Sequence, residues 1–146
     1  MKHFLHIPLL ILCMFASHVF SQSFSDATVK KQTKGPYIEF TKTTHSFGTI
    51  TFGEPASYNF EFTNTGTEPL IITNVRSTCG CTVPQWNTQA IAPGASESIT
   101  VSYDTKRSGG FSKGITVYTN AVNKEIILII EGEVTANPNK PVLGEK

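Results

Sequence analysis

The chain has 146 residues, a length typical of one domain once any targeting segment is removed. Its 12 lysines and arginines nearly balance its 11 aspartates and glutamates, so the composition indicates no basic surface for nucleic acid or an anionic membrane. Ten phenylalanines, four tyrosines and one tryptophan suffice for a sizeable hydrophobic core.

The N-terminal segment has the pattern of a secretory signal peptide. Lys2 precedes an apolar run that ends at Val19 and is shorter than the roughly 20 apolar residues of a membrane-spanning helix. Val19 and Ser21 stand at the −3 and −1 positions of a cleavage site. We therefore predict a signal peptide at residues 1–21, cut between Ser21 and Gln22.

Export decides the compartment and the cysteine content of the mature chain. Removing residues 1–21 also removes Cys13 and leaves Cys79 and Cys81, in the periplasm or outside the cell, where disulfides persist. Cys13 would carry the lipid of a lipoprotein, but Leu12 before it is not the small residue expected there. No second long apolar run follows, so we expect no membrane span in the mature chain.

Three segments are expected after the signal peptide. Residues 22–35 are polar and aperiodic, as in a flexible linker. Residues 36–134 show short apolar alternations separated by turn residues, and we predict one all-β domain there. Residues 135–146 contain two prolines and few apolar residues, so we expect a flexible tail.

Several runs in the domain alternate between apolar and polar residues. In SYNFEFTN, Tyr58, Phe60 and Phe62 share one face, and this period of two predicts a half-buried strand. ESITVSY and KGITVYT repeat the pattern. Their side chains expected to face inward are Ile99, Val101, Tyr103, Ile115 and Val117. The run IILII at residues 126–130 is apolar on both faces, which predicts a central strand covered on both sides or an interface strand.

Turn residues separate these runs. NTGTEP (64–69), APGAS (92–96) and RSGG (107–110) combine glycine, which allows positive φ, with residues that favour turns. Asn64 and Gly66 are expected to take left-handed backbone conformations at the end of a strand. No stretch shows a helical stripe, and about seven short strands predict an immunoglobulin-like β-sandwich.

The order of these motifs resembles a known family. The stretch that begins IEFTKTTHSFGTI and includes FEFTNTG and STCGCTVPQW, followed by IAPGASESITVSYD and IILIIEGEV, resembles the bacterial exported family catalogued as domain of unknown function 1573. The similarity covers residues 37–134. It implies an immunoglobulin-like sandwich and export in Gram-negative bacteria, and it implies no activity, because none is established for the family.

Two cysteines separated by one glycine are the main candidates for chemistry. In a straight strand Cys79 and Cys81 would lie about 6.6 Å apart on one face, whereas the Cβ atoms of a disulfide lie about 3.8 Å apart. A bend at Gly80 would close the pair, because glycine reaches conformations that other residues avoid. A three-residue loop contributes only about 1.6 kcal/mol by the chain-entropy formula, so such a bond, or one between two chains, would suit exchange better than structure.

Metal binding, redox chemistry and a purely structural role remain alternatives for this pair. Zinc would need two further ligands, whereas soft Cu(I) accepts two thiolates. His45, which we place between two strands as a surface or turn residue, is the candidate to complete a site. A redox thiol needs a positive neighbour such as Arg76 to lower its pKa. In the structural alternative, Cys79 and Cys81 are small semi-buried groups that shape a turn.

The remaining polar and aromatic candidates have ordinary structural explanations. Trp86 follows a proline and is expected to cover one end of the core, with a carbohydrate platform as the alternative. Lys106 and Arg107 fit a solvated hairpin tip, and Glu131 and Glu133 fit a solvated edge at the end of the last strand. No nucleophile motif such as GxSxG organises the serines, histidines and aspartates.

These patterns favour a protein that binds rather than one that catalyses. We expect an exported non-catalytic immunoglobulin-like interaction or structural module of the bacterial envelope, without a cofactor, whose partner is an envelope or extracellular protein. The alternative is a periplasmic thiol protein that binds Cu(I) or zinc, or exchanges disulfides, through Cys79 and Cys81.

Overall fold

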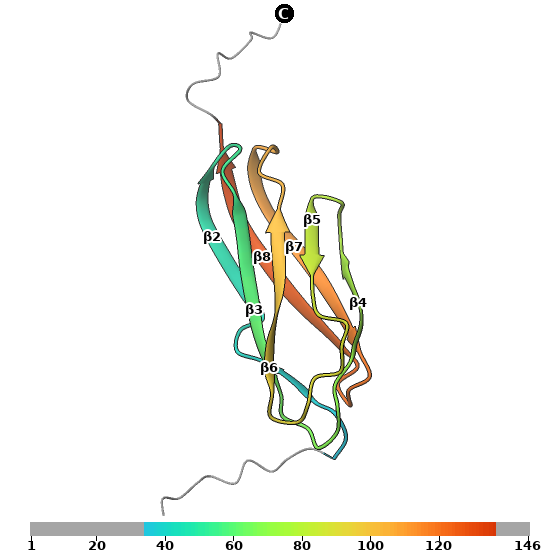
Figure 1. The fold of residues 1–146 in the computed structure, drawn as a ribbon. Helices are drawn as coiled ribbons and strands as arrows, with labels where there is room; N and C mark the ends of the chain where they lie inside the picture. Colours follow the sequence, from blue (N-terminus) through green and yellow to red (C-terminus); the bar gives the residue numbers. More distant parts are fainter. Residues whose placement is uncertain (1–33, 137–146) are drawn as a thin grey trace, which may run out of the picture.

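The computed structural model describes residues 34–136, which form two β-sheets packed face to face (Figure 1). The predicted signal peptide with its Ser21–Gln22 cleavage site lies outside the described residues, as do most of the predicted linker and most of the predicted tail. Residues 34–136 contain no helix, so none there is long and apolar enough to cross a membrane.

Eight strands build the two layers, one more than the approximate number predicted. In chain order they are β1 (Ile38–Phe40), β2 (Thr44–Thr51), β3 (Ala56–Asn64), β4 (Ile72–Ser77), β5 (Thr82–Gln85), β6 (Ser96–Tyr103), β7 (Gly109–Thr119) and β8 (Glu125–Thr135). One sheet has the strand order β1-β3-β6-β5 and the other the order β2-β8-β7-β4. Strands β2 and β8 pair in parallel, and the other neighbours pair antiparallel. The prediction of an all-β, immunoglobulin-like sandwich is confirmed.

The core lies between the two sheets and follows the alternation of the sequence. Phe60 and Phe62 are each 1% exposed, whereas Glu61 between them is exposed. The five residues predicted to face inward from β6 and β7 are all buried, and Tyr58 is half-buried against the core. Burial of a large apolar side chain contributes about 1.5–3 kcal/mol, so this alternation is the main source of the fold's stability.

Strand β8 is central in its sheet but is covered on one face only. Leu128 and Ile130 are fully buried, whereas Ile127 is 58% exposed and Ile129 is partly exposed. The predicted central position is confirmed, since β2 and β7 flank the strand. The predicted cover on both faces is not found in the described residues, because no third layer lies over this sheet, and the alternative of an interface strand stays a prediction.

Asn64 ends β3 as a buried polar hub and not in the left-handed turn conformation that the sequence suggested. No non-glycine residue of the described chain has a positive φ, and Gly66 does not either. The Asn64 side chain is 0% exposed, accepts the Gly66 N–H at 3.1 Å and donates to the carbonyls of Glu68 and Ile91 at 2.8 and 3.0 Å. The Asn64 side chain, which can both donate and accept hydrogen bonds, therefore cross-links the chain at this end of the sandwich.

Gly66 is needed for space, not for backbone freedom. A Cβ atom there would lie 2.5 Å from the Tyr37 nitrogen and would also collide with the Gly35 carbonyl oxygen. The conformational prediction holds instead at Gly94 and Gly109, whose φ values are 78° and 106°.

Candidate functional site: the Cys79–Cys81 turn

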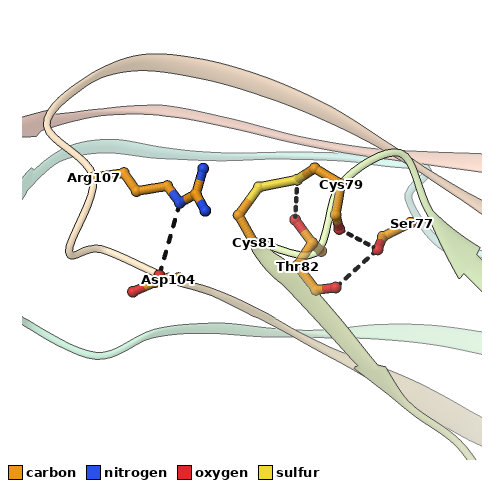
Figure 2. Close-up of a disulfide and its surroundings, with 6 residues drawn as sticks. All are labelled: Ser77, Cys79, Cys81, Thr82, Asp104 and Arg107. Atoms are coloured by element: carbon orange, nitrogen blue, oxygen red, sulfur yellow. Dashed lines mark hydrogen bonds and ion pairs between the residues drawn. A yellow bond between two sulfur atoms is a disulfide. The ribbon is translucent and has the colours of Figure 1, made fainter.

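The two cysteines lie in the connection that carries the chain from one sheet to the other. Strand β4 ends at Ser77 in one sheet, and β5 begins at Thr82 in the other. Between them Cys79 and Cys81 form a disulfide, with their Cα atoms 5.3 Å apart. This is shorter than the roughly 6.6 Å expected along a straight strand, because the backbone turns here. Figure 2 shows the bond and its neighbours.

Hydrogen bonds with the flanking strands, with β7 and with the loop after β6 hold the turn. The Ser77 hydroxyl lies 2.6 Å from the Cys79 carbonyl oxygen and 2.9 Å from that of Thr82, so it can bridge the two sides of the turn (Figure 2). The Cys81 carbonyl accepts the N–H of Asp104, after β6, at 2.8 Å, and the Thr78 N–H donates to Gly114 of β7 at 3.0 Å. These bonds do not involve the sulfur atoms, so we expect them to anchor the turn without the disulfide as well.

The two sulfur-bearing residues differ in their environment. Cys81 is 3% exposed and belongs to the hydrophobic core, whereas Cys79 is half-buried at the margin of that core. The Cys79 sulfur has the Thr82 hydroxyl 3.8 Å away as a polar neighbour. An incoming thiolate would therefore reach Cys79 before it reaches Cys81.

Gly80 does not supply the bend in the way that the sequence suggested. Its φ lies outside the left-handed range, and a Cβ atom there would meet nothing within 4 Å. Neither a positive φ nor a lack of space therefore requires glycine at this position.

Positive charge lies near the disulfide but is solvated. Figure 2 shows Arg107 on the loop that follows β6, drawn beside the disulfide and joined to Asp104 by a contact of 3.9 Å. Their side chains are 67% and 47% exposed, so this ion pair contributes little energy. Arg76, the positive neighbour named from the sequence, is exposed on β4 opposite Thr116.

The structure does not bring His45 to the cysteines. His45 lies within β2, not between strands as predicted, and β2 and β4 are the opposite edges of one four-stranded sheet. Three strand spacings of about 4.8 Å place the two edges about 14 Å apart. No group of three histidines, cysteines, aspartates or glutamates within residues 34–136 could hold a metal ion. The Cu(I) or zinc hypothesis thus stays a prediction that relies on the two thiols alone.

His45 belongs instead to an aromatic contact that sequence analysis missed. Its ring stacks on Tyr58 of β3 at 3.6 Å between centroids and meets Phe47 edge-on at 4.5 Å. Partial burial, and secondarily the positive charge of Lys42, lower the pKa of His45 below 6.5. The neutral imidazole is therefore favoured against Tyr58. Period-two alternation places Tyr58 on the inner face, but it carries no signal of which strand of the other sheet lies opposite.

The other candidates occupy structural positions. Trp86 packs against the core, and its Nε1 is the buried side-chain nitrogen or oxygen without a hydrogen-bond partner in the described part of the chain. Lys106 and Arg107 are exposed in the loop between β6 and β7. Glu131 and Glu133 are exposed on one face of β8, but this strand is central and not at an edge of the sheet.

Comparisons with solved structures agree on the fold. A protein of unknown function from Porphyromonas gingivalis W83 superposes with a TM-score of 0.60 at 19% identity, over 69% of this chain and 47% of that one. The ASH / PapD-like domain 7 of human CEP192 gives a TM-score of 0.59 at 11% identity, over 68% of this chain and 85% of that one. The chain thus spans about half the length of the Porphyromonas protein, and at these identities the likeness shows the fold alone.

The sequence comparison identifies the family. No curated protein shows a significant match to the sequence. The family model described as "Protein of unknown function (DUF1573)" matches residues 38–134, which is more than half of the chain and nearly all of the two-sheet sandwich. This confirms the resemblance seen in the FEFTNTG and STCGCT motifs, and the chain belongs to the DUF1573 family.

Proposed function

We propose that the chain is an exported, non-catalytic immunoglobulin-like interaction module of the bacterial envelope. The family has no assigned activity, and the fold is one that displays surfaces on a rigid scaffold. The observation that carries the proposal is that the buried polar side chains already have partners within the protein. Asn64, Thr105 and Thr119 all bond to the protein's own backbone, and the Thr82 hydroxyl lies by a sulfur.

A catalytic site needs polar groups that are buried but free to meet a substrate. In residues 34–136 the one buried side-chain nitrogen or oxygen without a partner is Trp86 Nε1, and an indole N–H neither titrates nor attacks. The lowered pKa of His45 follows from its partial burial and, secondarily, from the positive charge of Lys42, and its ring is stacked on Tyr58. These features support binding over catalysis.

Export is the part of the proposal that the N-terminal sequence supports. A protein cleaved after Ser21 begins at Gln22, and mass spectrometry of the exported protein tests this directly. A lipid-modified Cys13, or a full-length chain that stays in the cytoplasm, would contradict it.

Disulfide exchange is a second candidate function, favoured by the disulfide itself. A thiolate of a partner dithiol protein would attack the more exposed Cys79 sulfur, form a mixed disulfide and release Cys81 as a thiolate that takes up a proton. The partner's second thiolate would then attack the sulfur of the partner's first cysteine in the mixed disulfide, and Cys79 would leave as a thiolate that takes up a proton. The partner is oxidised to a disulfide and this chain is reduced to a dithiol, which balances the two electrons.

One experiment separates the two candidates. Purified full chain and its Cys79→Ser, Cys81→Ser double variant are used to capture proteins from the envelope of the native cell, with free thiols blocked at lysis. An interaction module retains the same partners in both forms. Exchange predicts partners held through a reductant-sensitive bond that the double variant loses. Failure of both forms to retain any envelope protein contradicts the leading proposal.

A further inference from the structure

Strand β3 has a backbone edge that is covered along only half of its length. Strand β1 pairs with residues Phe62 to Asn64, and the Thr41 N–H adds one bond to the Glu61 carbonyl at 3.0 Å. The chain then leaves this sheet, and from Thr44 it pairs with β8 in the other sheet. The first five residues of β3, numbers 56–60, therefore have β6 on one side and no strand of the described chain on the other.

The uncovered edge exposes main-chain hydrogen-bonding groups. In an antiparallel ladder, alternate residues direct both N–H and C=O to the same side. Asn64 bonds to Ala95 and Gly94 on the β6 side, and Glu61 bonds to Thr41 on the β1 side. By this alternation Asn59 and Ser57 direct their backbones to the open side, where no described residue pairs with them.

A groove lies along this edge. It has a volume of about 570 Å³, within the range of about 300–1,000 Å³ that ligand sites occupy. Its lining residues are Thr41, Lys42, Ser57, Tyr58, Asn59 and Glu61. The groove therefore combines two backbone donors, two backbone acceptors, one aromatic ring, the positive charge of Lys42 and the negative charge of Glu61.

The other sheet edges have features that discourage strand pairing. Pro84 lies within β5, and β1 is only three residues long. The ladder of β2 shifts register between Ser46 and Thr49, and that of β4 shifts between Ile72 and Asn74. Such features are the usual protection of exposed edges. The open part of β3, with the sequence ASYNF, contains no proline, charge or register shift, so it is the edge best suited to accept a strand.

We propose that this open edge binds an extended peptide segment of a partner protein, which adds a strand to the sheet beside β3. The inference rests on the proposed interaction function and names its surface. Lys42 has no ion-pair partner in residues 34–136, whereas Glu61 at the same groove would repel a second carboxylate. The segment therefore carries an acidic residue beside Lys42 and none beside Glu61. An apolar residue of the segment covers the ring of Tyr58, which is half-buried against His45. Main-chain bonds supply affinity and these two contacts supply specificity.

A second copy of the chain fits this edge less well. If two β3 strands paired so that Ser57 faced Asn59 of the other copy, Pro55 would face Glu61, whose carbonyl already bonds to Thr41. Pro55 also has no N–H to donate. A free peptide avoids this conflict because it can end before Glu61.

The test selects short random peptides on the immobilised full chain and measures the affinity of synthetic copies. Selected peptides should combine alternating apolar residues with an acidic one. Asn59→Pro should weaken them at least about tenfold, because proline removes an N–H that points only to the open side. Lys42→Glu should weaken them, whereas Lys106→Glu, the same charge change at an exposed distant loop, should not. Peptide binding should also slow hydrogen exchange of the Ser57 and Asn59 amides.

A control on the ligand guards against misfolding of the proline variant. Copies of the selected peptides that are N-methylated on their backbone keep every side chain but cannot donate to the edge, and they should lose binding to the unmodified chain. Equal binding of methylated and unmodified peptides, or of wild type and Asn59→Pro, overturns the proposal, as does a failure to select any peptide. If the wild type dimerises and Asn59→Pro does not, the edge pairs with a second copy of the chain, and this result also overturns the proposal.

The same variant distinguishes this inference from the proposed function. If wild type and Asn59→Pro retain an envelope partner equally, the protein has an interaction function, but the β3 edge is not its binding surface. Absence of any envelope partner contradicts the function itself.

Discussion

The two ends of the sandwich are closed in different ways. At one end Asn64 and Gly66 form a corner in which a buried amide cross-links the chain and a missing side chain makes room for the backbone. At the other end Cys79 and Cys81 join through a disulfide in a turn that backbone and hydroxyl groups already hold. The first end cannot lose a group without leaving buried partners unsatisfied, whereas the second can. We therefore expect the asparagine corner to contribute more to stability than the disulfide does.

The core between the two ends sets the scale for this comparison. Phe60→Ala removes a side chain that is 1% exposed, and such a change costs about 3–5 kcal/mol of unfolding free energy. Domains of this size are stable by about 5–15 kcal/mol, so the variant should lose much of its stability. Denaturant unfolding measures it, with the exposed neighbour Glu61→Ala as control. Equal midpoints for the two variants would refute the assigned strand phase.

The asparagine corner should be nearly as sensitive as the core. Asn64→Ala leaves the Gly66 N–H and the carbonyls of Glu68 and Ile91 without their side-chain partner. Each lost buried hydrogen bond costs on the order of 1 kcal/mol or more, so we expect a loss of about 2–4 kcal/mol.

Asn59→Ala is the matched control for that change, since Asn59 lies in the same strand but is exposed. Within residues 34–136 its side chain accepts one hydrogen bond, from the Thr100 hydroxyl at 2.9 Å. This variant should shift the unfolding free energy by less than about 1 kcal/mol. Similar losses for the two asparagine variants would show that the corner is not a structural hub.

Local periodicity predicted much of the sandwich, and the errors share a cause. Phe60, Ile99 and Val117 were predicted correctly because inward burial follows a period of two within one strand. The role of Asn64 was not predicted, because its partner Ile91 lies 27 residues away and reaches it only in the folded chain. The residues of the NTG motif favour a turn. The local sequence does not show whether the asparagine side chain is exposed in that turn or buried with partners from other segments.

The candidate sites show the same limit. The sequence singled out Cys79 and Cys81 by their spacing, but two partners of their turn, Asp104 after β6 and Gly114 in β7, lie far along the chain. The open edge of β3 was missed because it depends on where β1 leaves one sheet for the other. Long-range pairing of this kind has no local signature, so His45 was placed in a loop although it lies in a strand.

The cysteine end should tolerate loss of its covalent bond. A loop of three residues restricts the unfolded chain little, so the Cys79→Ser, Cys81→Ser double variant should lose no more than about 1.5 kcal/mol. It should also lose any disulfide exchange or Cu(I) binding that the wild type shows. Denaturant unfolding and thiol titration measure the two effects. A double variant that fails to fold would make the pair structural and remove the contrast between the two ends.

The smallest effect is expected at the glycine between the cysteines. Gly80→Val adds a side chain where a Cβ meets nothing within 4 Å and where φ is not left-handed, so we expect a change below about 0.5 kcal/mol. The disulfide should still form, and titration of the unfolded variant should find no more free thiols than in the wild type. Gly66→Ala is the control at the other end, because even one methyl group there collides with the backbone of Tyr37. Free cysteines in Gly80→Val would show that the turn, like the asparagine corner, depends on its glycine.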